Sequence, residues 1–423
     1  MRFFLISFLL CFSNFGGFVT LVTKFYAPAI QYLLVGSWCL VFLSFAIVRR
    51  FKDFEKFLRD PLLYCPVLLI LIIVSIEIIN SCVLGNRSFS KDVLEQSIYF
   101  CAIISLFPMT FLFSYFIKND RSFFKKTILL FTIVQCSLGL VQDFFIIFFR
   151  GPLFLTTSYS IRNGFPRFLF PSGCNWLVLC YCYSSFFQRQ KEFRFLRIFC
   201  FILIVMTDCL IIQTRGLIIT NCILLLVLTL KSVFFKKTNG WLRFSVASTI
   251  VVFSGVILGA CLCVFSHSFI FSLVYSDLSL TARIDAIRYF FSSFLSHPFF
   301  GRGFFQEETN SSSAFYFYHG YQGFWTRIDV GLVGFLDLFG SLAFVLYFYL
   351  ILHYLRLLKS IDGTHESWTS LGLSILFFTI ATIPTLCVFD YERFLVLCVS
   401  LSLASCLNAG ECRTMVRSSR IIL

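Results

Sequence analysis

The chain has 423 residues, of which 58% are hydrophobic and only 13% are charged, and its mean hydropathy is +0.88. A soluble globular domain carries about 25% charged residues, so this composition excludes a soluble fold and predicts a polytopic membrane protein. The formal net charge of +14 does not indicate nucleic-acid binding, because the positive residues lie in short clusters between apolar runs. That distribution is the pattern that membrane topology produces.

The 18 cysteines do not suggest a disulfide or metal framework. Nearly all of them lie inside apolar runs, where cysteine acts as a small apolar residue. The candidate outer loops 150–167 and 271–323 contain no cysteine, and the sequence has no C-x-x-C pair that would indicate a bound metal. We therefore predict neither a metal nor another cofactor.

Apolar runs of about 20 residues predict an all-α fold of about twelve transmembrane helices in a single membrane domain, residues 1–423. The first run follows Arg2 and resembles a signal peptide, but no small-x-small cleavage site follows, so we expect an uncleaved helix. Residues 198–212 and 216–235 are short runs that could instead form one long broken helix. The predicted spans are 3–22, 28–48, 61–84, 97–117, 127–149, 168–187, 198–212, 216–235, 244–270, 329–355, 369–390 and 394–409.

The distribution of positive charge predicts that both termini are cytoplasmic. With twelve spans, 23 lysines and arginines fall on the cytoplasmic side and 12 fall on the outer side, in agreement with the positive-inside rule. Eight of the outer residues are Arg215 and the arginines of 150–167 and 271–327. An outer loop has no topological need for arginine, so these residues indicate an anionic ligand.

The large outer loop 271–328, between the ninth and tenth predicted spans, contains the longest polar segment of the chain. Its residues 283–296 predict an amphipathic helix that lies on the outer membrane interface and ends at His297-Pro298. The expected apolar face carries Ile284, Ile287, Phe291, Phe294 and Leu295, and the expected polar face carries Arg283, Asp285, Arg288, Ser292 and Ser293.

Short motifs follow one another in a fixed order over residues 135–340. They are L-G-L-V-Q at 138–142, Q-T-R-G at 213–216, Arg283, H-P-F-F-G-R-G-F at 297–304, Y-H-G at 318–320 and D-V-G-L-V-G at 329–334. This region resembles the O-antigen ligase and polymerase family of bacterial envelope glycosyltransferases. Gly320 stands where the family usually has Asn, Asp329 stands where it has Glu, and a Trp common after the helix-opening Arg is absent.

The resemblance implies a metal-independent, inverting glycosyltransferase of the bacterial inner membrane with its active site on the periplasmic side. Such an enzyme takes a glycan from undecaprenyl diphosphate and transfers it to an acceptor hydroxyl. The implied partners are a lipid-linked oligosaccharide or polysaccharide donor, a glycan or lipid A-core acceptor, and the bilayer. A polymerase that joins lipid-linked repeats and a ligase that joins the finished glycan to lipid A-core both fit the motifs.

The leaving lipid diphosphate gains negative charge in the transition state, which suits arginine because its guanidinium is always charged and bidentate to phosphate. By resemblance and by outer position, we expect Arg215, Arg283 and Arg288 to bind the diphosphate. His319 is the candidate general base, since an unperturbed imidazole has a pKa of about 6.5. Possible substrate contacts are Arg162, Arg167, Arg302 and Asp329, and the glycines expected to serve backbone turns and helix packing are Gly301, Gly303, Gly331 and Gly334.

Each of these residues also has a structural alternative. Arg215 could extend to lipid headgroups, and Arg283 and Arg288 could bind anionic lipid without specificity. His319 could be an ordinary polar residue of a tyrosine-rich loop. A non-catalytic membrane assembly protein would leave the outer arginines and histidine unexplained.

A second class of function is a secondary transporter or flippase of lipid-linked sugars. Glu77, Asp143 and Asp208 lie inside apolar runs, and carboxylates within spans often mark ion paths. However, the sequence shows neither matched halves nor a pair of Gly- or Pro-broken spans in equivalent positions, which are typical of such transporters.

Overall fold

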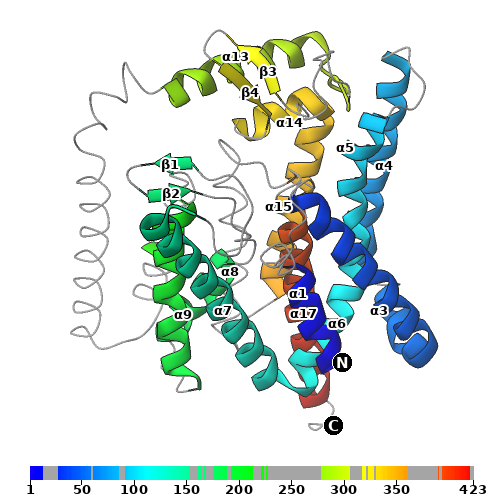
Figure 1. The fold of residues 1–423 in the computed structure, drawn as a ribbon. Helices are drawn as coiled ribbons and strands as arrows, with labels where there is room; N and C mark the ends of the chain where they lie inside the picture. The colour runs from blue at the N-terminus through cyan, green and yellow to red at the C-terminus, as the bar shows by residue number, and fades with distance from the viewer. Residues whose placement is uncertain are drawn as a thin grey trace, which may run out of the picture.

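A computed structural model of the chain consists of helices joined by turns and two short β-hairpins (Figure 1). Three of the described helical segments are long and apolar enough to cross a membrane, namely Leu63–Cys82, Ser97–Asn119 and Arg121–Phe149. The helical class therefore agrees with the prediction, and the count of twelve spans stays a prediction. The structure describes residues 1–12, 27–58, 61–84, 91–151, 160–162, 165–167, 175–187, 192–212, 221–222, 225–226, 278–304, 317–320, 323–327, 330–360, 389 and 393–419.

Most predicted spans that fall on described residues correspond to helices. The run 61–84 coincides with α4, because it is bounded by a proline and lies in one uninterrupted apolar stretch. The spans 216–235, 244–270 and 369–390 lie almost wholly outside the described residues. The other matching helices are α1 (Arg2–Phe12), α3 (Ala27–Leu58), α7 (Arg121–Phe149), α8 (Asn175–Phe187), α9 (Arg194–Thr207) continued by the π-helix η2 (Asp208–Ile212), and α17 (Phe394–Ser419).

Two predicted spans are interrupted. The run 97–117 contains a short 3-10 segment, so that it comprises the end of α5 (Lys91–Cys101), η1 (Ala102–Ser105) and most of α6 (Leu106–Asn119). The run 329–355 is divided at Gly340 into α14 (Leu332–Phe339) and α15 (Leu342–Ser360). Gly340 has a φ of +55°, which lies outside the range of a right-handed helix.

Two antiparallel hairpins were not anticipated from the sequence. Strand β1 (Ser160–Arg162) pairs with β2 (Phe165–Arg167), and β3 (Phe317–Gly320) pairs with β4 (Gly323–Thr326). The dipeptide Asn163-Gly164 lies between the first two strands, and Asn-Gly is a strong signal for a two-residue hairpin turn. The turn of the first hairpin was therefore predictable from the sequence.

Aromatic side chains form much of the core between α1, α3 and α6. Trp38 stacks on Phe42 with ring centroids 5.1 Å apart and approaches Phe8 at 4.9 Å. The indole nitrogen of Trp38 donates a hydrogen bond to the carbonyl oxygen of Phe4 at 3.1 Å. A buried Trp N–H needs such a partner, so this bond fixes α1 against α3.

Helices α6 and α17 pack in parallel, with small side chains between them. Three side chains of α17, spaced four residues apart, each contact a backbone carbonyl oxygen of the η1–α6 segment. The contacted carbonyls are also four residues apart and follow in the same chain order, which shows that the helices run parallel. Small residues at every fourth position let two helices approach closely. The contacts are Cys398 Sγ to Ala102 O (3.6 Å), Ser402 Oγ to Leu106 O (3.5 Å) and Cys406 Sγ to Thr110 O (3.2 Å).

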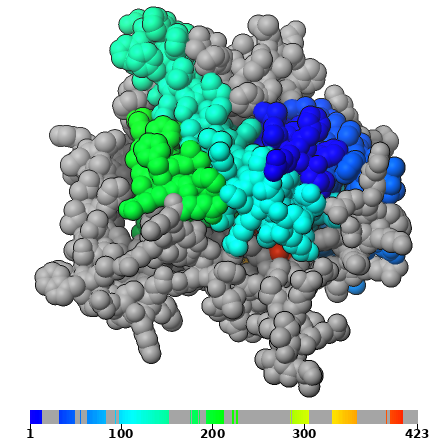
Figure 2. All heavy atoms as spheres, turned by 90° about the horizontal axis from the view of Figure 1, so that it is seen from below, coloured from blue at the N-terminus to red at the C-terminus, as the bar shows by residue number. Residues whose placement is uncertain are grey.

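The N-terminus and the end of α17 lie at the same end of the molecule, and the β3–β4 hairpin lies at the opposite end (Figure 1). Figure 2 shows the end with the termini, where α1, the α6–α7 segment and α9 adjoin one another at the surface. This arrangement is compatible with two termini on one side of a membrane.

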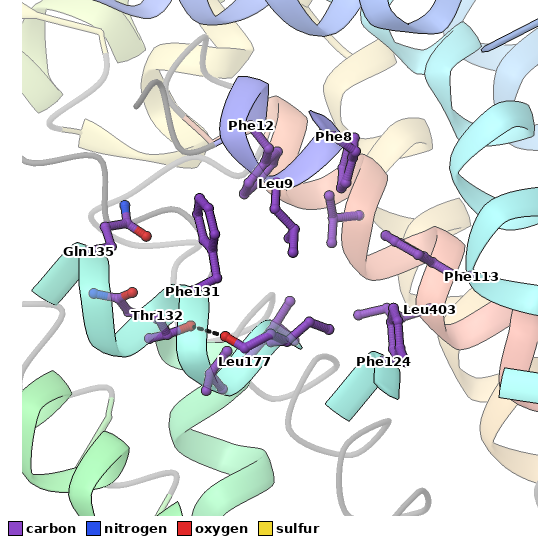
Figure 3. Close-up of a pocket in the computed structure, with 14 residues that line it drawn as sticks. Phe8, Leu9, Phe12, Phe113, Phe124, Phe131, Thr132, Gln135, Leu177 and Leu403 are labelled. Carbon is purple, nitrogen blue, oxygen red and sulfur yellow. Dashed lines mark hydrogen bonds between the residues drawn. The ribbon is translucent and has the colours of Figure 1, made fainter. Parts of the chain in front are cut away.

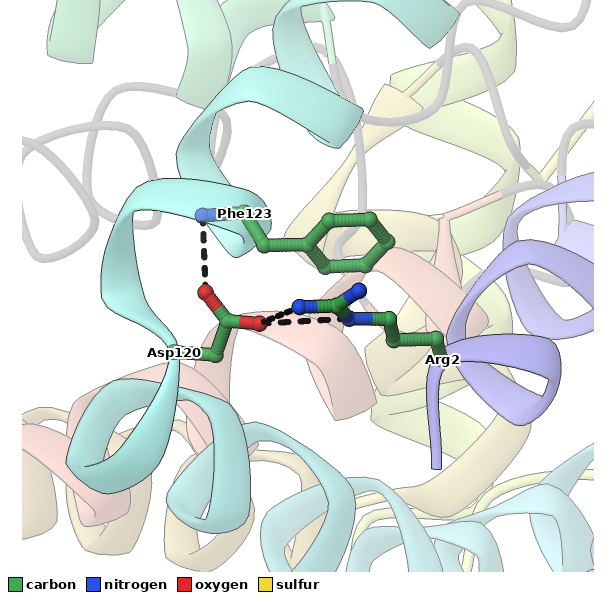
Figure 4. Close-up of polar contacts among 3 residues, drawn as sticks. All are labelled: Arg2, Asp120 and Phe123. Carbon is green, nitrogen blue, oxygen red and sulfur yellow. Dashed lines mark hydrogen bonds and ion pairs between the residues drawn. The ribbon is translucent and has the colours of Figure 1, made fainter.

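At this end, one carboxylate joins α1 to the beginning of α7 (Figure 4). Asp120 Oδ2 lies 2.7 Å from Arg2 Nη2, and Asp120 Oδ1 accepts a hydrogen bond from the backbone N–H of Phe123 at 3.3 Å. The guanidinium of Arg2 lies 4.7 Å from the ring centroid of Phe123. Asp120 is thus the N-cap of α7 and the anchor of the first helix.

We expect Asp120→Ala to lower the free energy of unfolding by about 1 kcal/mol, because an N-cap carboxylate is lost. Thermal unfolding of the purified protein in detergent micelles measures this change. Asn119→Ala is the matched control, since its exposed side chain donates a hydrogen bond to the preceding turn, at Tyr115 O. Equal melting temperatures of the two variants would contradict the assignment of Asp120 as a cap.

Candidate functional site

The predicted outer loop folds around one helix. Helix α13 (Leu278–Ser296) packs against α14 and against both strands of the β3–β4 hairpin. It ends directly before His297-Pro298, as the sequence predicts. The segment that follows, residues 297–304, is called the glycine turn below because it contains Gly301 and Gly303.

The protein-facing side of α13 differs from the predicted polar and apolar faces. Ile284 and Phe291 of the predicted apolar face are exposed, which suits a helix that meets lipid. Ser293, which was expected on the polar outer face, is instead buried against α14. Its hydroxyl donates a hydrogen bond to Asp337 Oδ1. The helix contacts the rest of the protein mainly through Phe290 and its neighbours.

One edge of the glycine turn binds the C-terminal end of α14. The backbone N–H groups of Arg302 and Gly303 donate to the carbonyl oxygens of Asp337 and Leu338 at 2.7 and 3.0 Å. The last carbonyls of a helix have no partner within the helix. The turn supplies these partners and thereby completes the end of α14.

The backbone of the glycine turn also explains why α14 and α15 are separate. Gly301 has a φ of +64°, and a Cβ atom on it would lie 2.6 Å from both Asp337 O and the nitrogen of Gly340. Ser341 N donates to Pro298 O at 2.8 Å. The expectation of one continuous helix over 329–355 is therefore wrong, because another backbone crosses at Gly340.

The other edge of the turn lies on the end of α4. Ser81 Oγ accepts a hydrogen bond from the N–H of Phe304 at 2.7 Å and donates to Glu77 O at 2.6 Å. Asn80 donates to Glu77 Oε2 at 3.2 Å. A Cβ atom on Gly303 would collide with the Ser81 hydroxyl. Glu77 is fully buried, and its Oε1 has no hydrogen-bond partner among the residues that the structure describes.

A buried ion pair lies beneath these contacts. The side chain of Asp337 has no exposed surface, and its Oδ2 lies 2.6 Å from Nε of Arg327, which is 5% exposed. Gly334 packs against the Arg327 carbonyl so closely that a Cβ atom would not fit. Asp337 was missed in the sequence, since one carboxylate in an apolar run belongs to no motif. The signal that could have found it is its need for a cationic partner.

The structure brings three segments that carry predicted site residues into one assembly. Arg288 is exposed on α13. Arg302 of the glycine turn donates to Tyr289 Oη at 3.1 Å, and its guanidinium lies 5.6 Å from that ring. His319 lies in β3 opposite Phe324, and β3 packs on α13.

Several predicted site residues are described only in part or not at all. Arg283 lies within α13, but the structure does not describe its side chain. Gly331 precedes α14 with a φ of +55°. Arg215 and Asp329 lie outside the described residues.

Arg162 and Arg167 belong to a second group. They lie in the β1–β2 hairpin, where Arg167 pairs with Ser160, and β2 packs against η2 and α7. Asp208 opens the π-helix η2, and such turns often occur at functional sites. Its Oδ2 accepts a hydrogen bond from Asn221 at 3.0 Å, and its buried Oδ1 has no hydrogen-bond partner within the described part of the chain.

A cavity of about 70 Å³ lies between α1, α7, α8 and α17 and is lined mostly by aromatic and branched side chains (Figure 3). Thr132, Gln135 and Asn175 supply its polar edge. None of the predicted site residues lines this cavity. Among the residues described, no group of three or more His, Cys, Asp or Glu side chains is arranged to hold a metal ion.

Neither protein-family models nor curated protein sequences show a match to this chain. The likeness to the O-antigen ligase and polymerase family therefore rests on the order of its motifs.

We expect Gly301→Ala to destabilise the protein by about 2–4 kcal/mol, because it combines a positive φ with a clash against backbone atoms. Thermal unfolding in detergent micelles measures the effect. Gly36→Ala in α3 is the matched control, since a Cβ atom there meets nothing within 4 Å and alanine favours the helix. If the two variants unfold at the same temperature, the close crossing at Gly301 is refuted.

Proposed function

We propose that the protein is an inner-membrane glycosyltransferase that transfers an undecaprenyl-diphosphate-linked glycan to an acceptor hydroxyl on the periplasmic side. It would act as an O-antigen or surface-polysaccharide polymerase or as an O-antigen ligase. The twelve-span topology with cytoplasmic termini and the periplasmic loop 271–328 belong to this proposal. The observation that carries it is the common packing of α13, the glycine turn and the β3–β4 hairpin, at the end opposite to the termini (Figure 1).

In the proposed reaction, one bond at the anomeric carbon breaks and another forms. The bond from this carbon to the phosphate oxygen breaks, and the lipid diphosphate leaves with the electron pair. The acceptor oxygen attacks from the opposite face, which inverts the configuration, and its proton passes to His319. Arg215, Arg283 and Arg288 balance the charge that develops on the diphosphate. Such preorganised electrostatic stabilisation is usually the largest catalytic contribution.

Arg302 is a cation of this group with a described side-chain partner, Tyr289. The contact with Tyr289 restrains the guanidinium. A guanidinium that is already oriented loses less conformational entropy on binding phosphate than a flexible side chain does. We assign to it a contact with the diphosphate or the adjoining sugar of the donor.

We expect His319→Ala and Arg283→Ala each to abolish glycan transfer while the protein remains in the membrane at its normal level. Staining of surface glycan from a null strain that expresses each variant provides the measurement. His365→Ala, in a predicted cytoplasmic loop, is the matched control and should retain transfer. Normal surface glycan in both site variants would refute the site.

Polymerase and ligase differ in what a null strain accumulates. Loss of a polymerase leaves lipid A-core that carries a single repeat. Loss of a ligase leaves long chains on the lipid carrier. Separation of lipid A-core and carrier-linked glycans by length distinguishes the two.

Transport of lipid-linked sugars is a second candidate, favoured by the buried carboxylates. Glu77, Asp143 and Asp208 are each at most 5% exposed, and each has one oxygen without a hydrogen-bond partner in the described part of the structure. Groups of this kind within apolar helices often serve ion or proton paths.

The orientation of the accumulated lipid-linked glycan separates transfer from transport. For a transferase, we expect the null strain to accumulate carrier-linked glycan that faces outward, because the step before transfer is complete. Oxidation of intact cells with membrane-impermeant periodate, followed by analysis of carrier-linked glycan, measures this. Protection of the glycan from periodate would show that it still faces the cytoplasm and would favour transport.

A further inference from the structure

Three segments of the outer end meet at one residue, Asp337. Its Oδ1 accepts a hydrogen bond from Ser293 of α13, and its Oδ2 pairs with Arg327, which directly follows β4. Its backbone carbonyl accepts the N–H of Arg302 in the glycine turn. Each of the three segments carries one member of the proposed site: α13 carries Arg288, the β3–β4 hairpin carries His319, and the turn carries Arg302.

Because this ion pair is buried, its two side chains must be well placed relative to each other. Asp337 is fully buried and Arg327 nearly so, and a charge removed from water is tolerated only when its partner is well placed. The close contact of Gly334 with the Arg327 backbone removes space for adjustment. The ion pair and this backbone contact therefore both tie the residue that follows β4 to α14.

We propose that Asp337 is a positioning residue that sets the relative placement of the His319 hairpin, the Arg288 helix and the Arg302 turn. Asp337 itself lies away from solvent and contacts no substrate. The effect of Asp337 on catalysis depends on the proposed glycosyl transfer. Its effect on the placement of the three segments follows from the described contacts and does not depend on that function. A displacement of about 1 Å at a reacting group can lower a rate about 100-fold.

The kinetic test uses the purified full-length protein with an undecaprenyl-diphosphate-linked oligosaccharide as donor. Asp337→Asn removes the charge with little change of volume, and Arg327→Lys keeps the charge but loses the planar fork. We expect kcat to fall at least tenfold in both variants with the donor KM changed less than twofold, because orientation and not donor binding is lost. Unchanged kcat in both variants would overturn the proposal.

Glu192→Gln is the matched control for this experiment. It breaks another ion pair, in which Glu192 Oε2 lies 3.0 Å from Lys125 Nζ, between the start of α7 and the segment before α9. We expect wild-type kcat and KM for this variant. A fall in kcat equal to that of Asp337→Asn would show a general loss of stability and would also overturn the proposal.

A second measurement does not require glycan transfer. In the native protein, we expect trypsin to cleave slowly after Arg327, because this residue is buried against Asp337. We expect Asp337→Asn to raise the rate of this cleavage at least tenfold, detected by mass spectrometry, with Glu192→Gln unchanged. Equal rates would refute the positional role. Absence of transfer by the wild-type protein would refute the proposed function, and the trypsin result would still decide the role of Asp337.

Discussion

A carboxylate without access to water organises the end of this protein that carries α13 and the β3–β4 hairpin. Asp337 cannot be stable as a buried charge unless a cation and hydrogen-bond donors surround it, and Arg327 and Ser293 meet that need. Ser293 lies 44 residues before Asp337 in the sequence, and Arg327 lies in the segment that follows β4. The requirement of one desolvated group thus joins α13, the residue after β4 and α14.

The glycine turn extends this constraint to the membrane helices. It bonds the carbonyls that end α14 on one edge and the Ser81 hydroxyl of α4 on the other. Because Gly301 carries no side chain, the backbone of the turn approaches the backbone of Asp337, Leu338 and Gly340 at distances that no other residue allows. The absence of a side chain on Gly303 leaves room for the Ser81 hydroxyl. The turn is consequently attached to α14 by main-chain hydrogen bonds and to α4 through the Ser81 side chain.

Features with a local cause were predictable from the sequence, and features with a tertiary cause were not. The helix over 61–84 follows from its own apolar run. The end of α13 follows from His297-Pro298. The break at Gly340 depends on the glycine turn, whose approach no pattern within 329–355 reveals.

For the candidate site, the packing of its segments also has a tertiary cause. The resemblance implied a common site for Arg288, Arg302 and His319, which stays a prediction. The structure shows that β3 packs on α13 and that Arg302 contacts Tyr289 of α13. The resemblance did not predict that Ser293 faces inward or that Asp337 is its partner, because both depend on which side of α13 meets α14.

The parallel packing of α6 and α17 has a consequence for the chain between them. When two parallel helices both cross a bilayer, the segment that joins them must cross an odd number of times to return to the starting side. The prediction places seven spans between them, which satisfies this parity. One broken helix in place of 198–212 and 216–235 would leave six and reverse α17, against the order of its contacts with α6. On the predicted spans, the parallel packing of α6 and α17 is therefore compatible with two spans at 198–212 and 216–235, which stay a prediction.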